Sequence, residues 1–400
     1  MNASRFAADS LEVGRIVVCV GCGGVGKTTV AAALALEAAR RHRKVAVITI
    51  DPARRLADAL GVGKLGNEPQ EIPRDQLTAL GVPEDGGLFA MMLDMKRTFD
   101  DLVERFSEDP AARDKVLKNP IYRHVSDALA GSVEYSAMEK VFQLCEQERF
   151  DLVIVDTPPA QHALDFLDAP QRMVDFLESR IVQILIHPAM AAGRFGFKVF
   201  HRGASKILQL LERVSGLGFL EDISEFLMAF EHMSEGFRDR AVQVRELLLG
   251  PEASFVLVAG PARESAIQAE QLHDRLEATG VPLSAVLINR VHRWPGDSGV
   301  PPLRADAPPA PADIAALEAA LAGNEGPDFP AETAARAAIA AATGYAEQVR
   351  RDVRATESLQ RRTERQGRYW GTIPELAEDV HDLAGLGRVA DLIFERSVEG

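Results

Sequence analysis

Short apolar runs separated by polar segments predict a chain in which strands and helices alternate. The first run, RIVVCVG at residues 15–21, is rich in β-branched residues and ends in glycine, which is typical of a buried strand. The Ala/Leu-rich segment 28–42 becomes basic at its end, as expected of a helix with cations at its C-terminus. A second apolar run, KVAVITIDPA at residues 44–53, stops at Asp51 and Pro52. This order of strand, glycine loop, helix and strand predicts a βαβ unit with a parallel sheet.

The same alternation returns further along the chain. Four more apolar runs predict strands, at residues 88–94, 149–160, 254–262 and 283–291. Between residues 160 and 250 no run suits a strand, and the abundance of Phe, Leu and Met there predicts helices. The Pro- and Gly-rich residues 292–312 predict a loop, and residues 313–365 predict largely solvent-facing helices. No internal repeat is evident, so we expect a single copy of the unit.

The charge balance and the cysteine content narrow the function. The chain has 400 residues and a net charge of −14, and an acidic surface repels phosphate backbones, which argues against nucleic-acid binding. No 18-residue apolar run and no signal-like N-terminus occur, so we expect a cytoplasmic protein with at most peripheral membrane association. Three cysteines are an odd and sparse count, which fits a reducing compartment and argues against structural zinc.

The stretch VGCGGVGKTT at residues 20–29 satisfies the phosphate-loop pattern GxxxxGK[ST] and lies between the first strand and the first helix. Its glycines allow backbone N–H groups to turn around phosphate oxygens at the positive end of that helix. Lys27 places an ammonium group at the β and γ phosphates, and the Thr28 hydroxyl binds Mg²⁺. The alternative is a glycine-rich turn with an exposed lysine. The predicted nucleotide-binding residues of this loop are Gly21, Cys22, Gly23, Gly24, Val25, Gly26, Lys27, Thr28 and Thr29.

Two aspartates end predicted strands and are candidates for the same site. Asp156 follows the run LVIV, where a carboxylate facing a phosphate loop holds a Mg²⁺-bound water. The alternative for Asp156 is a helix cap. Asp51 ends the second strand, where its carboxylate could orient and polarise the attacking water. The alternative for Asp51 is a turn residue before proline.

Several motifs together resemble one family. The glycine loop, DPARRLADAL and DTPPAQHALDFL occur in this order, and LVAGPARESAIQAEQL, VLINRV and IPELAEDVHDLAGLGRVADLIF follow. The set resembles the arsenical pump-driving ATPases, which include the ATPases that target tail-anchored membrane proteins. The amino-acid sequence of several of these stretches is most similar to bacterial homologues of the targeting ATPases. The resemblance spans nearly the whole chain. It implies one P-loop NTPase domain over residues 1–400, with a doubly wound, mainly parallel α/β sheet and a helical insert at residues 165–250.

The resemblance also implies roles for individual residues. Asp51 would be the catalytic carboxylate of switch I, acting with Lys27, and Asp156 would begin a switch II that continues through residues 157–159. Asn289 would hydrogen-bond adenine, which suits a side chain with both a donor and an acceptor, although a turn residue is the alternative. The backbone at Pro374 would cover the base. Glu264 would lie near the nucleotide and the dimer interface.

Position 22 departs from the family pattern, because the family has GKGG where this chain has GCGG. That lysine reaches the partner subunit's phosphates, and Cys22 carries no such charge. Three consequences are open: hydrolysis is slow, another cation such as Arg54 or Arg55 replaces the lysine, or the chain pairs with a lysine-bearing paralogue. We favour the interpretation that hydrolysis is weak or depends on a partner. Cys22 is a small residue that fits the loop or a thiol of lowered pKa at a helix N-terminus. The CxxC spacing of Cys19 and Cys22 lies within the first predicted strand and the phosphate loop, which argues against a zinc-clasped dimer, and the three cysteines do not resemble a metalloid site.

Two apolar stripes at helical spacing lie within residues 170–250. One comprises Phe176, Leu177, Ile181, Ile184 and Leu185, and the other Ile223, Phe226, Leu227, Phe230 and Met233. By resemblance this region would form a groove for an apolar client helix. The alternative is that the stripes bury one another or pack on the sheet.

Taken together, the sequence predicts a dimeric switch that binds and hydrolyses Mg²⁺-ATP and handles a hydrophobic protein segment. Two alternatives remain open. One is an energy-coupling subunit of an anion or metalloid pump, and the other is a nucleotide-binding scaffold with little turnover.

Overall fold

The structure, a computed structural model, is described over most of the chain. The described residues are 2–51, 55–107, 109–119, 122, 132–158, 175, 236, 239–240, 242–295, 301, 303, 311–321 and 330–395. Most of the expected helical insert at 165–250 therefore lies outside the described residues, as do both of its apolar stripes and Arg54.

The described strands form one eight-stranded sheet in the order β3-β4-β2-β5-β1-β6-β7-β8. Every neighbouring pair is parallel except β3 and β4, which are antiparallel. The strands are β1 (Ile16–Gly21), β2 (Lys44–Thr49), β3 (Gln70–Glu71), β4 (Gly87–Met92), β5 (Leu152–Asp156), β6 (Ala253–Ala259), β7 (Leu283–Val291) and β8 (Tyr369–Pro374). The α/β fold with a mostly parallel sheet is thus confirmed.

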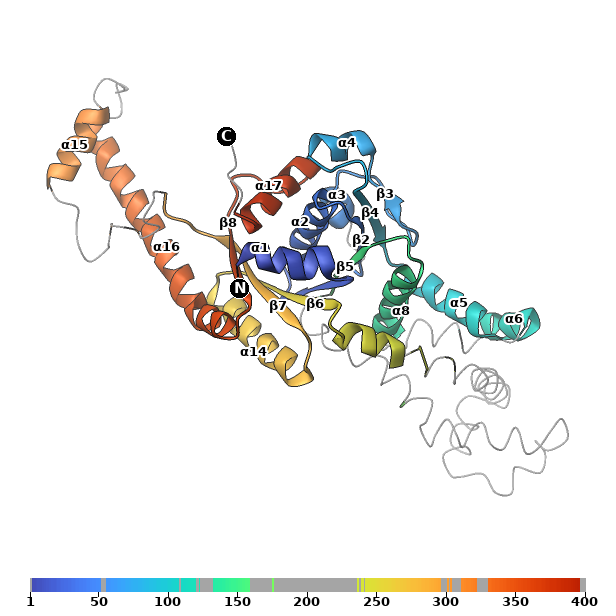
Figure 1. Cartoon of the computed structure of the whole chain (residues 1–400). Helices are drawn as coiled ribbons and strands as arrows, with labels where there is room; N and C mark the ends of the chain where they lie inside the picture. Colours follow the sequence, from blue (N-terminus) through green and yellow to red (C-terminus); the bar gives the residue numbers. More distant parts are fainter. Residues whose placement is uncertain are drawn as a thin grey trace, which may run out of the picture.

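Helices cover both faces of this sheet (Figure 1). Alternate side chains of β1 point to opposite faces, so that Val17 belongs to one apolar cluster and Val18 to the other. The cluster around Val17 contains side chains of α1 (Ala3–Phe6), the π-helix η1 (Ala7–Val13), α2 (Lys27–Arg40), α3 (Arg55–Ala59), α4 (Arg74–Ala79) and α17 (Leu383–Ile393). The cluster around Val18 contains side chains of α5 (Met95–Phe106), α6 (Pro110–Lys118), α8 (Ser132–Glu146), α14 (Arg263–Thr279) and α16 (Ala331–Arg365).

One end of α16 packs on the sheet, and the rest of this 35-residue helix extends away from it (Figure 1). Leu359, near its C-terminal end, belongs to the apolar cluster around Val18. At 1.5 Å per residue the helix is roughly 50 Å long, and α15 (Pro311–Leu321) lies beside its outer part. Nowhere in the described part of the chain does a helix have the length and apolarity that crossing a membrane requires.

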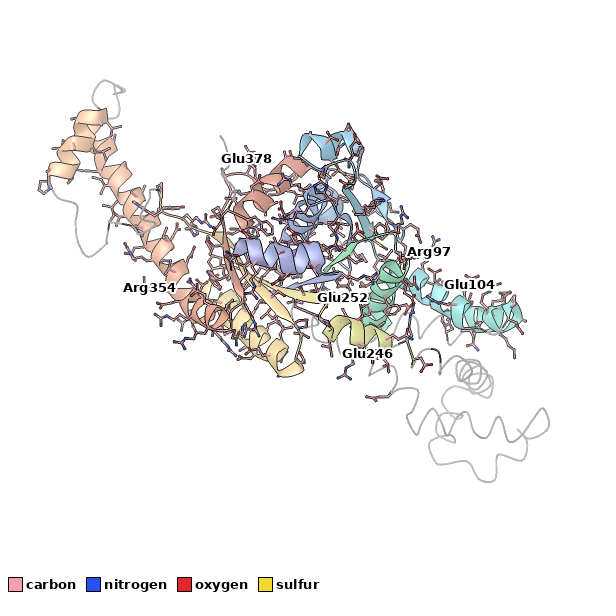
Figure 2. The ribbon with its side chains drawn as sticks, viewed as in Figure 1. Arg97, Glu104, Glu246, Glu252, Arg354 and Glu378 are labelled. Atoms are coloured by element: carbon pink, nitrogen blue, oxygen red, sulfur yellow. The ribbon has the colours of Figure 1, made fainter. Side chains whose placement is uncertain are left out.

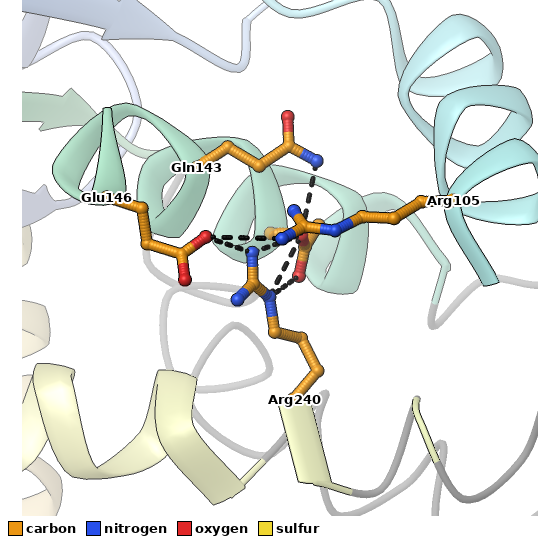
Figure 3. A network of polar contacts seen from close by, with 5 residues as sticks. Arg105, Gln143, Glu146 and Arg240 are labelled. Atoms are coloured by element: carbon orange, nitrogen blue, oxygen red, sulfur yellow. Dashed lines mark hydrogen bonds and ion pairs between the residues drawn. The ribbon is translucent and has the colours of Figure 1, made fainter.

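A buried ion pair fastens the helical residues 242–249 to α8 (Figure 3). The Nε of Arg240, which is itself helical, donates to Oε2 of Glu139 over 3.0 Å, and its Nη2 donates to Oε1 over 3.1 Å. Arg240 also donates to Glu146 over 2.7 Å. Arg105 of α5 extends toward the same two glutamates. This network holds three helices on one face of the sheet.

The expected strands are present, but most are shorter than the apolar runs. The run at 44–53 forms a strand only to Thr49, and the run at 149–160 forms one only over Leu152–Asp156. Both strands end at a polar residue, Thr49 and Asp156, and these two are paired in register. Residues 283–291 form β7 as predicted. β3 and β8 were not predicted, because β3 has two residues and Gly371 and Pro374 interrupt the apolar pattern of β8.

Candidate nucleotide-binding site

The glycine loop follows β1 and leads into α2, as the motif requires. Gly26 precedes α2 with φ 86°, a left-handed conformation that favours glycine. A Cβ atom at this position would lie 2.2 Å from the Nδ2 atom of Asn289. Gly24 is also left-handed, with φ 76°, but a Cβ atom there would meet nothing within 4 Å. The two glycines are therefore required for different reasons, one for backbone shape alone and one also for close approach.

Lys27 points back along the loop, and its Nζ donates to the carbonyl oxygen of Cys22 over 2.8 Å. Burial lowers the pKa of this ammonium group, and the nearby Asp156 carboxylate opposes the shift. The Cys22 side chain is itself buried and packs in the apolar cluster with α2. Burial raises the pKa of the Cys22 thiol, so the structure does not support a thiol of lowered pKa and favours a small residue that fits.

Asp156 at the end of β5 lies between the loop and β2. In the sheet it is paired in register with Cys19 of β1 and Thr49 of β2. The Thr28 hydroxyl donates to Oδ2 of Asp156 over 2.7 Å, and the Thr49 hydroxyl donates to the same atom over 2.9 Å. The sequence-predicted pair Thr28 and Asp156 is therefore in direct contact. Thr49 is a further member of the site that the sequence did not indicate.

The second carboxylate oxygen of Asp156 suits a divalent cation. Oδ1 is buried and has no hydrogen-bond partner among the described residues. Burial raises the pKa of this carboxyl, against the hydrogen bonds from Thr28 and Thr49. A buried carboxylate oxygen without a partner is unfavourable, and a hard cation with oxygen ligands would satisfy it. The donor set of one carboxylate and one hydroxyl beside a phosphate loop fits Mg²⁺.

Asp51 lies just beyond β2 at the same edge of the sheet. Its backbone N–H donates to Oγ1 of Thr49 over 3.2 Å, and its carboxylate is partly exposed. Nη1 of Arg55, the first residue of α3, lies 3.5 Å from Oδ2 of Asp51. On the other side, the Thr157 hydroxyl donates to the carbonyl oxygen of Cys19 over 2.8 Å. Asp51 thus contacts β2 and α3, whereas Asp156 and Thr157 contact the start of α2 and the strand β1.

Asn289 connects the loop with the second half of the sheet. Its Nδ2 donates to the carbonyl oxygen of Val25 over 2.9 Å, and its Oδ1 accepts the backbone N–H of Arg290 over 3.0 Å. The Nδ2 group keeps a second N–H, and the residue lines the pocket described next. Asn289 therefore supports the loop directly, a role that its position at a strand end did not indicate.

These side chains surround a pocket of about 520 Å³, within the usual range for small-molecule sites. Gly23, Gly24, Gly26, Lys27, Thr28, Thr29, Asp51, Asp156, Asn289 and Pro374 all line it, whereas Gly21, Cys22 and Val25 do not. Gly21 instead allows β1 to approach β6, since a Cβ atom there would lie 2.0 Å from the Val258 oxygen. Glu264 is exposed in the first turn of α14 and is not part of the lining.

The opposite wall comes from the segment between β8 and α17. Ile373, Pro374, Glu375, Leu376, Glu378, Asp379, Val380 and His381 line the pocket from this side, and Figure 2 shows Glu378 beside α17. Of these residues the sequence indicated only Pro374. The clue to the others was the glycine at 367, with φ 70° after α16, followed by the aromatic pair that opens β8.

Another cluster of potential metal ligands, His273, Asp274 and Glu277, lies on α14 outside this pocket. Arg362 pairs with Asp274 and Glu277, the latter over 2.7 Å. Arg368 contributes a further ion pair to Glu277 at 3.2 Å. Because cations of the protein already neutralise these carboxylates, the cluster joins α14 to the end of α16 and is a poor metal site.

The comparison with protein families agrees with this geometry. A family model described as anion-transporting ATPase matches residues 14–297, more than half of the 400-residue chain. The chain belongs to this family. It is an ATPase of the family, and the mostly parallel sheet is consistent with such an enzyme.

Individual relatives of the family align with parts of the chain. A protein named ATPase get3 from Schizosaccharomyces japonicus is 26% identical over 275 residues, covering 68% of this chain and 72% of that protein. ATPase GET3 from Malassezia globosa is 25% identical, covering 69% and 72%. An ATPase ASNA1 homolog from Entamoeba dispar is 33% identical over 43% of this chain and 51% of its own length. The chain thus spans about half the length of the Entamoeba relative and 72% of the length of each of the two fungal relatives.

Proposed function

We propose that the chain is a Mg²⁺-ATP-dependent switch that hydrolyses ATP to ADP and phosphate as a dimer. The observation that carries this proposal is the double hydrogen bond to Oδ2 of Asp156. Thr28 donates from the phosphate loop, and Thr49 donates from the strand that leads to Asp51. One carboxylate therefore connects the loop with both strand ends from which switch segments would start.

Each residue has a separate task in this scheme. The backbone N–H groups of residues 23–29 and the Lys27 ammonium bind the phosphates, while Thr28 and Asp156 hold the cation. When bound, Mg²⁺ neutralises charge on the phosphate oxygens. Asp51 orients the attacking water and accepts its proton. Asn289 and the backbone at Pro374 contact adenine.

The dimer and its client are finer proposals. Members of the group that the motifs resemble bury the nucleotide between subunits, so we infer either a homodimer or a heterodimer with a lysine-bearing paralogue. A hydrophobic, tail-anchored protein segment is the proposed client. The apolar stripes at 170–250 support it, although they lie outside the described residues. A cytoplasmic location with at most peripheral membrane contact, no nucleic-acid partner and a similarity to bacterial homologues stay predictions of the sequence.

A metalloid-pump function has less support. It requires thiol ligands, and the three cysteines are buried, with Cys19 and Cys145 on opposite faces of the sheet. A scaffold with little turnover is a second candidate, because Lys27 is the single cation within the loop residues 21–29. Turnover measurements separate the scaffold from the switch.

The test is hydrolysis and assembly by the purified full-length chain. Excess chain is mixed with radiolabelled ATP, with Mg²⁺ or with EDTA, and phosphate release is followed for hours. The proposal expects Mg²⁺-dependent release and a shift in molar mass, by light scattering, between ADP and a non-hydrolysable ATP analogue. Tight ATP binding without release of phosphate would favour the nucleotide-binding scaffold. If calorimetry detects no binding of an adenine nucleotide, both the switch and the scaffold are overturned. Arsenite-stimulated release would restore the pump.

A further inference from the structure

Two cationic side chains from different elements, Lys27 and Arg55, line the part of the pocket where we propose that the phosphates bind. Lys27, Arg55 and Arg290 are the lysine and arginine residues that line the described pocket. Arg290 lies 3.8 Å from Asp379 in the segment before α17, so it faces the wall formed by the C-terminal residues. Lys27 belongs to the loop. Among the described residues, Arg55 remains as the cation that can approach a bound phosphate chain from α3.

Arg55 is held beside Asp51, and it is not buried in the fold. Its Nη1 lies 3.5 Å from Oδ2 of Asp51, and its side chain is 65% exposed. Exposed ion pairs of this kind are weak and exchange partners easily. A guanidinium group binds phosphate oxygens with a planar, two-pronged set of donors, and several phosphate charges attract it more strongly than one carboxylate.

The loop itself offers little additional positive charge. Lys27 is its single cation, and its Nζ already donates to the carbonyl oxygen of Cys22. The residue that precedes the two central glycines, Cys22, turns its side chain into the apolar cluster and away from the pocket lining. Phosphoryl transfer develops charge on the oxygens of the transferred group, and enzymes place arginine there for this reason.

We propose that Arg55 is a catalytic residue that acts within its own subunit by moving from Asp51 to the terminal phosphate of ATP. Water attacks the γ-phosphorus, the bond to the β–γ bridging oxygen breaks, and ADP leaves with the electron pair. The water proton passes to Asp51, which Arg55 has released. Arg55 stays protonated throughout and neutralises the γ-phosphate oxygens. This inference rests on the proposed ATPase switch and assigns one of its contacts.

The alternative is that Arg55 only starts α3 through its i,i+4 pairing with Asp51. The two roles differ in what they predict for ligands. A residue that merely supports the helix affects ADP and ATP alike. A residue that binds the terminal phosphate distinguishes them, because ADP lacks that group.

The experiment compares Arg55→Ala, Arg55→Lys and the wild type as full-length chains. Calorimetry gives the affinity for Mg²⁺-ADP and for a Mg²⁺-bound non-hydrolysable ATP analogue, and single-turnover assays give the hydrolysis rate. We expect Arg55→Ala to lower the rate at least about 100-fold and to weaken the analogue about 10-fold, with ADP affinity nearly unchanged. Arg55→Lys retains the positive charge but lacks the planar, two-pronged set of donors. It should therefore recover part of the lost hydrolysis rate and part of the lost affinity for the analogue.

The control is Arg275→Ala, an exposed arginine of α14 that does not line the pocket; it should leave rate, affinities and thermal unfolding at wild-type values. An active Arg55→Ala chain, or equal losses for ADP and the analogue, overturns the assignment while the switch function stands. If the wild type binds ATP without hydrolysing it, the switch function fails, and the ADP-to-analogue ratio still decides whether Arg55 contacts the terminal phosphate.

Discussion

The Nδ2 atom of Asn289 lies 2.2 Å from the place that a Cβ atom would take at Gly26. The same nitrogen donates to the carbonyl oxygen of Val25. The Asn289 side chain at the end of β7 is therefore fitted so closely against the glycine loop that a Cβ atom at position 26 would displace it. A hydrogen bond and this close contact join the loop to the strand that carries Asn289.

Replacing Gly26 by alanine should destabilise the chain more than the same change at Gly24. Both residues are left-handed, so each alanine pays about 1 kcal/mol of backbone strain. Only the Cβ at position 26 meets a neighbour, and the displacement of Asn289 adds about 1–3 kcal/mol. Urea denaturation of both variants measures the difference. In Gly26→Ala/Asn289→Ala the clash is removed, so the double variant should lose less than the sum of the singles; strict additivity would contradict the close fit.

Asp156→Asn should abolish the effect of Mg²⁺ on nucleotide binding while preserving the fold. The amide oxygen still accepts from Thr28 and Thr49, but an NH2 group replaces the buried Oδ1, and this group cannot bind a cation. Calorimetry with the ATP analogue should show a gain in affinity on adding Mg²⁺ for the wild type and almost none for the variant, with hydrolysis at least about 100-fold slower. An equal gain in both chains would contradict Asp156 as the cation ligand. Asp75→Asn, on exposed α4, is the matched control.

The three cysteines should resist alkylation in the folded chain. The thiolate is the reactive form, and burial raises the pKa of Cys22 above its ordinary value and that of Cys145 to about 12. Cys19 shifts in the same direction, because it is buried and faces Asp156. Fewer thiolates therefore form at any given pH, and iodoacetamide labelling at pH 8, followed by intact mass, should be slower for the folded chain than for the denatured chain. Denatured chain should label at all three positions, whereas rapid single labelling of the folded chain at pH 7 would restore an activated Cys22.

Breaking the buried pair of Glu139 and Arg240 should cost far more than removing its exposed neighbour (Figure 3). The Glu139 side chain is 0% exposed and that of Arg240 6%, so Glu139→Gln leaves a buried guanidinium without its main partner and should cost about 3 kcal/mol. Glu146 is 44% exposed and contacts the same arginine, and Glu146→Gln should cost less than about 1 kcal/mol. Urea denaturation measures both. Similar losses for the two variants would mean that the pair is not the anchor of residues 242–249.

The sequence was most informative where a functional residue directly follows a strand along the chain. The loop, Asp51, Asp156 and Asn289 each end an apolar run, and because the carboxyl ends of parallel strands share one edge, these residues converge. The contact of Thr49 with Asp156 depends on β2 lying beside β5, a pairing of residues 107 positions apart in sequence. No local pattern contains that information. The burial of the Cys22 side chain was likewise decided by packing under α2.

The C-terminal wall of the pocket was the least predictable part. Its strand, β8, has Gly371 in the middle and Pro374 at the end, and both weaken the apolar alternation that indicates a strand. As the edge strand after β7, it tolerates proline where a central strand would not. Its position was set by pairing with β7, which the intervening 35-residue helix separates from it along the chain.

The late position of this wall affects when the protein can first hold its ligand during synthesis. The glycine loop leaves the ribosome early, but Ile373 to His381 follow after more than three hundred residues. A nascent chain emerges from its N-terminal end, so the glycine loop is made long before the residues of the opposite wall exist. The pocket is therefore complete only in the finished polypeptide, and a ligand that binds only the folded form then stabilises it by mass action.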